Sequence, residues 1–249
     1  MKKIYLFFVF VLSIFGTKAF AADFYWTGKG PNSNYNSLQN WALGSVSGGM
    51  PTVVPGASDN VFFTDGATKY NVDFSQSNIV FNNFTSNSTT NDFVFRLTAP
   101  SGSAKTLTIN GVMNLSSRAS FYSSSSGDIN YVGSLILKNS PILNNNELAV
   151  YLVFNSGTNI AIANNFNAMS IVVDNGTTLD LSNRTVYLKK YTNLDSEAGM
   201  LKLMNSASGI KLNSTTIHTE TIWFLDLNLS KSDFVIFPLL GTFKSIVFI

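Results

Sequence analysis

The chain has 249 residues, of which 45% are hydrophobic and 12% charged, and its formal net charge at pH 7 is +2. A net charge this small excludes the large basic surface with which proteins hold nucleic acid by its phosphates. Cysteine is absent and histidine occurs once, which excludes disulfides, a lipid-modified cysteine and metal sites built from cysteine or histidine.

Residues 1–21 have the order of a cleavable secretory signal peptide. A positively charged start precedes an apolar stretch over residues 4–15, and Ala19 and Ala21 supply the small residues at the −3 and −1 positions. The stretch is shorter than the roughly 18–20 apolar residues of a membrane-spanning helix. We therefore expect cleavage after about Ala21 and a mature protein that is secreted or on the cell surface, without a membrane span. Losing the three lysines of this segment leaves 13 cationic and 14 acidic residues, a net charge of −1.

Residues 22–65 combine aromatic, proline and acidic residues in an unusual order. An aromatic-Trp-x-Gly motif precedes an Asn-Trp dipeptide, a proline and an Asp-x-Val-x-Phe strand. These residues are Trp26, Gly28, Asn40, Trp41, Pro55, Asp59, Val61 and Phe63. The arrangement resembles a segment near the start of large surface proteins of the Bacteroidota and is similar to autotransporter passenger repeats.

The resemblance implies an adhesin-like protein in which this segment leads into a parallel β-helix. It covers about 40 of the 249 residues and implies a class of protein more than an activity. Two features differ from those proteins: the Asn34-Tyr35 region stands where a further tryptophan is usual, and we see no C-terminal sorting domain. We therefore consider that the chain is the N-terminal part of a larger adhesin.

Two roles fit the aromatic residues of this segment. Trp26 and Trp41 can close the open end of a stack of strands, where large rings bury much area and shield strand edges. Alternatively, Tyr25, Trp26, Tyr35 and Trp41 form a platform on which a glycan ring stacks. We favour the capping role, because aromatic residues at strand spacing usually belong to the core.

Short β-branched or alternating runs, each closed by Asn, Gly or Ser, recur over residues 66–249 and predict strands and turns. The predicted units consist of a strand, a turn and a second strand. They start near Ile79, Leu107, Leu135, Leu152, Ile171, Leu201 and Ile222. The intervals of 28, 28, 17, 19, 30 and 21 residues indicate an imperfect repeat.

Two all-β architectures fit this pattern. The one that we favour is a right-handed parallel β-helix, or β-solenoid, over residues 66–249, with residues 22–65 as an aromatic N-terminal cap. The alternative is a β-sandwich, in which the same strands pair as antiparallel hairpins. The apolar segment 223–249 would leave an unpaired strand edge in either case. From that edge we expect a truncated product or end-to-end self-association.

Residues with catalytic or metal-binding chemistry are sparse. His218 lies in a strand-like run and is interpreted as an outward-facing residue, because no acid or nucleophile has a matching spacing. The pairs Asp59 with Asp65 and Asp174 with Asp180 bracket turns but do not match a calcium loop. If the protein is a polysaccharide-cleaving β-helix, its candidate residues are Asp174, Asp180, Arg184 and Lys189.

The sequence favours a non-catalytic structural or adhesive protein of the cell surface, with no cofactor or metal. Its expected partners are surface glycans or other surface proteins. The alternative function is binding or cleavage of carbohydrate.

Overall fold

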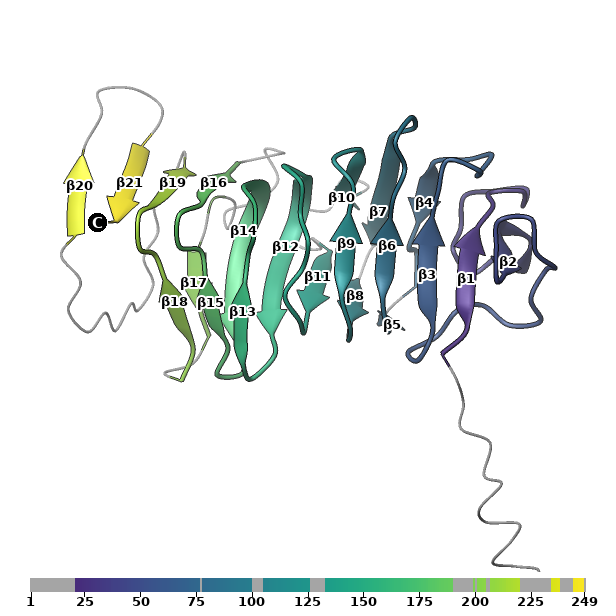
Figure 1. Ribbon diagram of the computed structural model, residues 1–249, viewed down its shortest axis with the longest axis horizontal. Helices are drawn as coiled ribbons and strands as arrows, with labels where there is room; N and C mark the ends of the chain where they lie inside the picture. Colours follow the sequence, from purple (N-terminus) through teal and green to yellow (C-terminus); the bar gives the residue numbers. More distant parts are fainter. Residues whose placement is uncertain are drawn as a thin grey trace, which may run out of the picture.

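The computed structural model is an elongated, all-β protein in which the strands follow one another along the long axis (Figure 1). It describes the residues 21–76, 78–99, 105–125, 133–189, 199, 201–204, 207–219, 234–237 and 244–248. In this part of the chain the single helical element is the 3-10 turn η1 (Leu38–Asn40). No described helix is long and apolar enough to cross a membrane.

The described strands form three sheets. The first contains, in spatial order, β2 (Trp41–Leu43), β1 (Asp23–Trp26), β3 (Asn60–Phe63), β6 (Phe84–Ser86) and β9 (Met113–Leu115). The long path of the second runs through β4 (Asn71–Asp73), β7 (Phe93–Ala99), β10 (Ala119–Ser125), β12 (Glu147–Asn155), β14 (Phe166–Asp174), β16 (Thr185–Leu188), β19 (Thr215–Thr219), β21 (Lys244–Phe248) and β20 (Phe234–Phe237). Beside it lie β5 (Ile79–Phe81), β8 (Thr106–Ile109), β11 (Ser134–Leu137) and β17 (Leu201–Leu203). The third contains β13 (Asn159–Ala161), β15 (Thr178–Asp180) and β18 (Gly209–Lys211).

Strands that pair in parallel form rows along the long axis of the molecule. One passage of the chain contributes strands to three different rows. Over residues 106–125, β8 pairs with β5 and β11, β9 pairs with β6, and β10 pairs with β7 and β12. We call such a passage a layer. The chain therefore bends between consecutive strands, which do not pair with each other. All of these pairs are parallel. This pairing does not fit the antiparallel hairpins that the β-sandwich requires.

Antiparallel pairs occur near the two ends of the described structure. At one end β1 pairs with β2, and at the other β21 pairs with β19 and β20. The remaining described pairs are parallel. The fold is thus a curled, largely parallel sheet structure.

The residues at which the predicted units start lie in one row of paired strands. The pairs in register are Ile79–Leu107, Leu107–Leu135, Leu135–Leu152, Leu152–Ile171 and Ile171–Leu201. Ile222 lies outside the described residues. The unequal intervals have a structural reason, because β12 and β14 run through two rows as single nine-residue strands, with a register shift between Leu148 and Tyr151 in β12. The layers that start at Leu135 and Leu152 are shorter for that reason.

The core is one continuous cluster from Phe24 to Ile217. Alternating strand residues point into it, as in β3, where Val61 and Phe63 are fully buried. Aromatic rings are concentrated in its first layers, whereas leucine, isoleucine and valine outnumber them in the later ones, where Phe154 and Phe166 are also buried. The core does not divide at residue 65, because β3 already pairs in parallel with β6. The expected cap thus shares its core with the segment that follows.

Two sequence-based expectations concern residues that the structure leaves undescribed. The signal peptide, except Ala21, lies outside the described residues, as does most of the apolar segment from Trp223 onward. The signal peptide and the self-association remain predictions from the sequence, whereas the described part of the apolar segment is not an unpaired edge of β19, because β21 pairs with β19 and β20 pairs with β21.

Candidate functional site

Trp26 and Trp41 lie inside the core. Their exposed fractions are 0% and 1%, and their rings meet edge to face with centroids 5.2 Å apart. Each indole N–H has an acceptor: Trp26 Nε1 donates to the carbonyl of Lys69 at 2.8 Å, and Trp41 Nε1 to that of Tyr35 at 2.6 Å. Their burial leaves neither ring an open face on which a glycan could stack, and the capping role stays a prediction from the sequence.

The two tyrosines of the expected glycan platform lie in different environments. Tyr35 is 7% exposed and packs against Phe74 and Phe81, and burial raises the pKa of its hydroxyl. Tyr25 is half-buried and stacks on Phe62, with centroids 4.8 Å apart. Three of the four platform residues are therefore buried, and the structure does not gather the four on one open surface.

The polar residues of the Trp-Gly and Asn-Trp motifs fix the loop between β1 and β2. Asn40 is fully buried; its Oδ1 accepts from Gly30 N, and its Nδ2 donates to the carbonyls of Asn32 and Asn34. Gly28 has a φ of +63°, and a Cβ there would lie 2.6 Å from the main-chain nitrogen of Lys69. The motif therefore has a local structural explanation.

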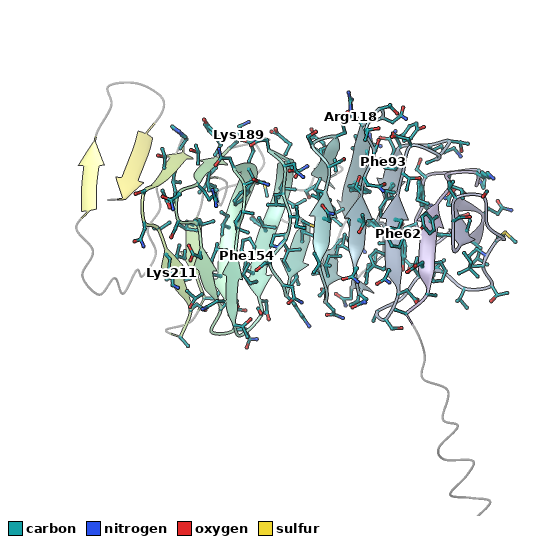
Figure 2. All side chains as sticks on the ribbon, in the orientation of Figure 1. Phe62, Phe93, Arg118, Phe154, Lys189 and Lys211 are labelled. Carbon is teal, nitrogen blue, oxygen red and sulfur yellow. The ribbon has the colours of Figure 1, made fainter. Side chains whose placement is uncertain are left out.

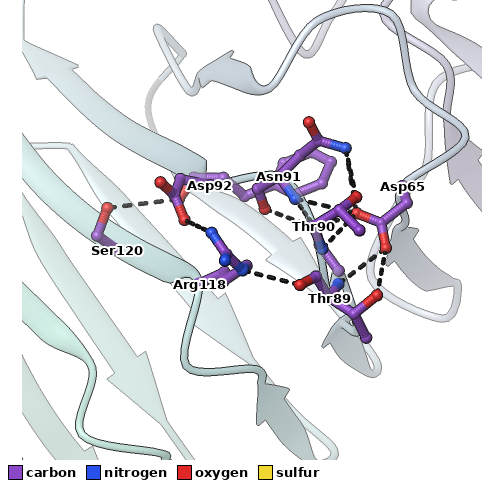
Figure 3. Close-up of polar contacts among 9 residues, drawn as sticks. Asp65, Thr89, Thr90, Asn91, Asp92, Arg118 and Ser120 are labelled. Atoms are coloured by element: carbon purple, nitrogen blue, oxygen red, sulfur yellow. Dashed lines mark hydrogen bonds and ion pairs between the residues drawn. The ribbon is translucent and has the colours of Figure 1, made fainter.

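Asp65 accepts hydrogen bonds from the turn of the next layer (Figure 3). Its carboxylate accepts from the main-chain N–H groups of Thr89, Thr90 and Asn91 at 2.8, 3.2 and 3.2 Å. The hydroxyls of Ser88 and Thr89 also donate to it. These donors, led by the Ser88 hydroxyl, hold the pKa of Asp65 far below its usual range.

Arg118 extends this network into the following layer. Its Nε donates to the carbonyl of Thr89 at 2.8 Å, and its Nη1 pairs with Asp92 at 2.8 Å (Figure 3). A carboxylate surrounded by main-chain N–H groups fills the place that an anion would occupy in such a turn. Asp65 therefore acts as a turn residue, but the segment between Asp59 and Asp65 is strand β3 and not the turn that the sequence predicted, because its alternating apolar residues point into the core.

The residues that would serve a polysaccharide-cleaving enzyme are spread over one layer, with Asp180 and Arg184 at one corner and Asp174 and Lys189 at two others. Asp174 accepts from Asn175 N in the turn between β14 and β15. Asp180 pairs in register with Lys211, whereas Lys189 follows β16 and forms an ion pair with Glu147 at 3.6 Å. Figure 2 shows Lys189 and Lys211 toward opposite long edges of the molecule.

Asp180 and Arg184 interact through their charges. Hydrogen bonds from Ser182, and more weakly the charges of Lys211 and Arg184, lower the pKa of Asp180. An ionised carboxylate of this kind suits a general base better than a general acid. Among the residues that the structure describes, no group of three or more His, Cys, Asp or Glu side chains could hold a metal ion.

His218 lies on β19 next to the buried Ile217. Its ring stacks on Tyr187 of β16, its register partner, with centroids 4.5 Å apart and an interplanar angle of 11°. This position agrees with the interpretation of His218 as an outward-facing strand residue.

A polar groove lies at the corner that leads from the row of β13 and β15 to the row of β14 and β16. It has a volume of about 680 Å³, and its lining residues are Ser117, Asn144, Asn145, Ala163, Asn164, Asn165, Asn183 and Arg184. Asn145 and Asn183 have left-handed backbone conformations, with φ of 55° and 59°. Such a conformation is one that asparagine tolerates at a tight corner.

The groove asparagines also tie the layers together. Asn144 Nδ2 donates to the carbonyl of Leu115, and Asn164 Nδ2 donates to that of Leu143, both at 2.6 Å. Arg184 Nε donates to the carbonyl of Ile162 at 2.8 Å. Sequence reasoning missed this groove, although Asn144, Asn164 and Asn183 recur at intervals close to those of the shorter layers.

No family model matches the chain, and no curated protein or solved structure is significantly similar to it. The site residues therefore rest on their own geometry, and the resemblance of residues 22–65 stays a prediction from the sequence.

Proposed function

We propose that the chain is an exported protein of the cell surface with a structural or adhesive role, built as a right-handed parallel β-helix. The motifs of residues 22–65 and the apparent signal peptide support this proposal. In it, Trp26 and Trp41 cap the stack of layers, and the partners are surface glycans or other surface proteins.

One observation carries the adhesive role, namely a surface that repeats from layer to layer. Thr108, Ile136, Val153 and Val172 lie side by side in register, on strands that are about 4.8 Å apart. All four are half-buried and alternate with the fully buried residues of their strands. A row of side chains at a fixed spacing suits an extended partner whose own groups repeat, such as a polysaccharide or a second stacked protein.

Export can be tested by expressing the full chain in a bacterium and separating the cytoplasm from the exported fractions. We expect the exported protein to begin at Ala22, as read from its N-terminal peptide by mass spectrometry. Protein that stays in the cytoplasm with residues 1–21 attached would contradict the proposal.

Carbohydrate binding in the polar groove is a second candidate function. Its walls carry amides from successive layers, and amide and guanidinium groups are suitable hydrogen-bonding partners for sugar hydroxyls. Ala163 is exposed and lines the groove, so Ala163→Trp fills it without removing any of the hydrogen bonds described above. If the groove binds glycans, this variant loses binding on a glycan array, whereas Ala57→Trp, at an exposed turn before β3, keeps it.

The purified protein that is used on the glycan array also serves to test for catalysis. The release of reducing ends from a polysaccharide, abolished by Asp180→Asn, would contradict the non-catalytic proposal. Unchanged polysaccharides across a broad panel would agree with it.

A further inference from the structure

Both main-chain polar groups of Ala22 form hydrogen bonds. Its main-chain N lies 3.1 Å from Asp59 Oδ1, and its carbonyl accepts from Asn60 N at 2.8 Å. The second carboxylate oxygen, Asp59 Oδ2, accepts from Gly56 N at 2.9 Å, which fixes the carboxylate in place. Ala22 also packs against the core, whereas Ala21 is exposed.

This anchored residue is also the first residue after the expected cleavage site. Hydrolysis of the Ala21–Ala22 peptide bond consumes one water molecule and leaves a carboxylate on Ala21 and an amine on Ala22. The amine takes up a proton near neutral pH, because an α-amino group has a pKa of about 7.7–8.0. Cleavage would therefore place a positive charge about where the main-chain N now contacts Asp59.

We propose that Asp59 is the binding site for the α-ammonium group of the mature chain, so that cleavage at Ala22 creates an ion pair that locks β1 onto β3. Before cleavage a neutral N–H donates to the Asp59 carboxylate, whereas after cleavage both partners are charged, so a Coulomb attraction is added to the hydrogen bond. Cleavage at a neighbouring bond would move the charge away from Asp59. The cap thus distinguishes a correctly cut N-terminus from a wrongly cut one.

Among the described residues, the neighbouring strands offer one other ionisable group close to this site. Asp23 is adjacent on β1, and its carboxylate accepts from the side chain of Asn60. The flanking strands β2 and β3 carry no ionisable side chain. Asp59 is therefore the carboxylate that the new ammonium group contacts, and Asp23 adds a second negative charge nearby. The proposal rests on the export part of the proposed function, since it needs cleavage after Ala21.

The test compares purified chains with different N-termini. One begins at Ala22 with a free amine, one at Ala22 with an acetylated amine, and one at Phe20 with two extra residues. At pH 6 we expect the free-amine form to have a Tm about 2–4 °C above the other two, the shift typical of a modest gain in a chain of this size. In an Asp59→Asn background we expect most of this difference to disappear, with Asp23 accounting for any small remainder.

The pH dependence has a defined sign. An ammonium group with a carboxylate partner has a raised pKa in the folded protein, so its stabilisation is complete below about pH 7.7 and is lost as pH rises through the raised value. The difference in Tm should therefore shrink at high pH. Equal Tm values at pH 6, or a difference that is undiminished by Asp59→Asn, would overturn the proposal.

A second measurement covers the case in which Asp59→Asn does not fold. The pKa of the α-amino group, measured by NMR in the unmodified chain, should lie above 8, and a value of 7.7–8.0 or lower would overturn the proposal. Because these measurements use purified chains, their failure differs from a failure of export, which would appear as a full-length cytoplasmic protein.

Discussion

At the scale of single residues, Asp65 joins two layers through one carboxylate. Its lowered pKa means that the folded protein favours the ionised form, so the stabilisation is present above the ordinary pKa of about 3.9 and is lost as pH falls toward the lowered value. Asp65→Asn turns an NH₂ group toward several N–H donors. We expect its Tm, followed by circular dichroism, to lie below that of the wild type at pH 7 and to approach it below about pH 4.

Asp92→Asn is the matched control for this prediction. Asp92 lies in the same network but forms an exposed ion pair with Arg118, and exposed pairs contribute little to stability. We expect Asp92→Asn to lower the Tm less than Asp65→Asn at pH 7. A Tm difference between Asp65→Asn and wild type that is constant from pH 3 to pH 7 would show that ionisation of Asp65 is unimportant.

The sequence predicted the role of Asp65 as a turn residue but not its partners. The donors to Asp65 come from residues 88–91, one layer later, and local spacing gives no information on which layers meet. Asn40 is a similar case, because its amide organises the loop from Gly30 to Asn34 through contacts that no motif describes. Residue types predicted turns here, and stacking decided the contacts.

At the scale of elements, β3 offers two adjacent phenylalanines with opposite environments. Phe63 is fully buried, with the rings of Phe84 and Phe95 4.8 and 4.7 Å away, whereas Phe62 is half-buried and stacks on Tyr25. We expect Phe63→Ala to lower the free energy of unfolding by about 3–5 kcal/mol in urea denaturation. Phe62→Ala should cost about 1 kcal/mol, the contribution of a surface aromatic pair. Equal losses of unfolding free energy would show that Phe63 does not face the core while Phe62 faces outward.

The corner between β14 and β15 gives a second test at this scale. Asn175 and Gly176 both have left-handed φ values, 53° and 67°, and Thr177 N donates to the carbonyl of Asp174 at 3.0 Å. A Cβ in this conformation costs roughly 1–2 kcal/mol, so Gly176→Ala should reduce the free energy of unfolding by about that amount. Asn175→Gly should be close to neutral because glycine adopts the conformation freely. Urea denaturation of both variants measures the difference.

An Asn-Gly pair between two strands is usually the signal of a β-hairpin. The sequence correctly predicted a turn here, with strands on both sides. The two strands nevertheless join different sheets, since β14 pairs with β12 and β16, and β15 pairs with β13 and β18. Partner choice depends on the layers before and after, which lie 19 to 31 residues away along the chain. A local turn signal cannot contain that information.

At the scale of the whole molecule, the recurrence of the predicted strands indicated the fold, although the intervals between them are unequal. The positions from Ile79 to Leu201 pair in register despite unequal spacing, because apolar strand residues must stack on each other in successive layers. The sequence did not reveal that each layer visits three rows, or that β12 and β14 span two rows. Both depend on where the chain bends, and the bends are made by contacts between layers.

Layered contacts predict that destabilisation spreads only to neighbouring layers. Leu179 of β15 and Phe63 of β3 are both fully buried, but their strands lie at separate places along the long axis (Figure 1). In structures whose layers contact only their neighbours, stability is nearly a sum of local terms. Native-state hydrogen exchange should therefore show Leu179→Ala losing protection mainly in β13–β18, and Phe63→Ala mainly in β1–β9. Phe62→Ala is the control. Equal loss of protection along the whole chain would instead indicate one cooperative unit, because local loss requires that one layer can open while the next remains packed.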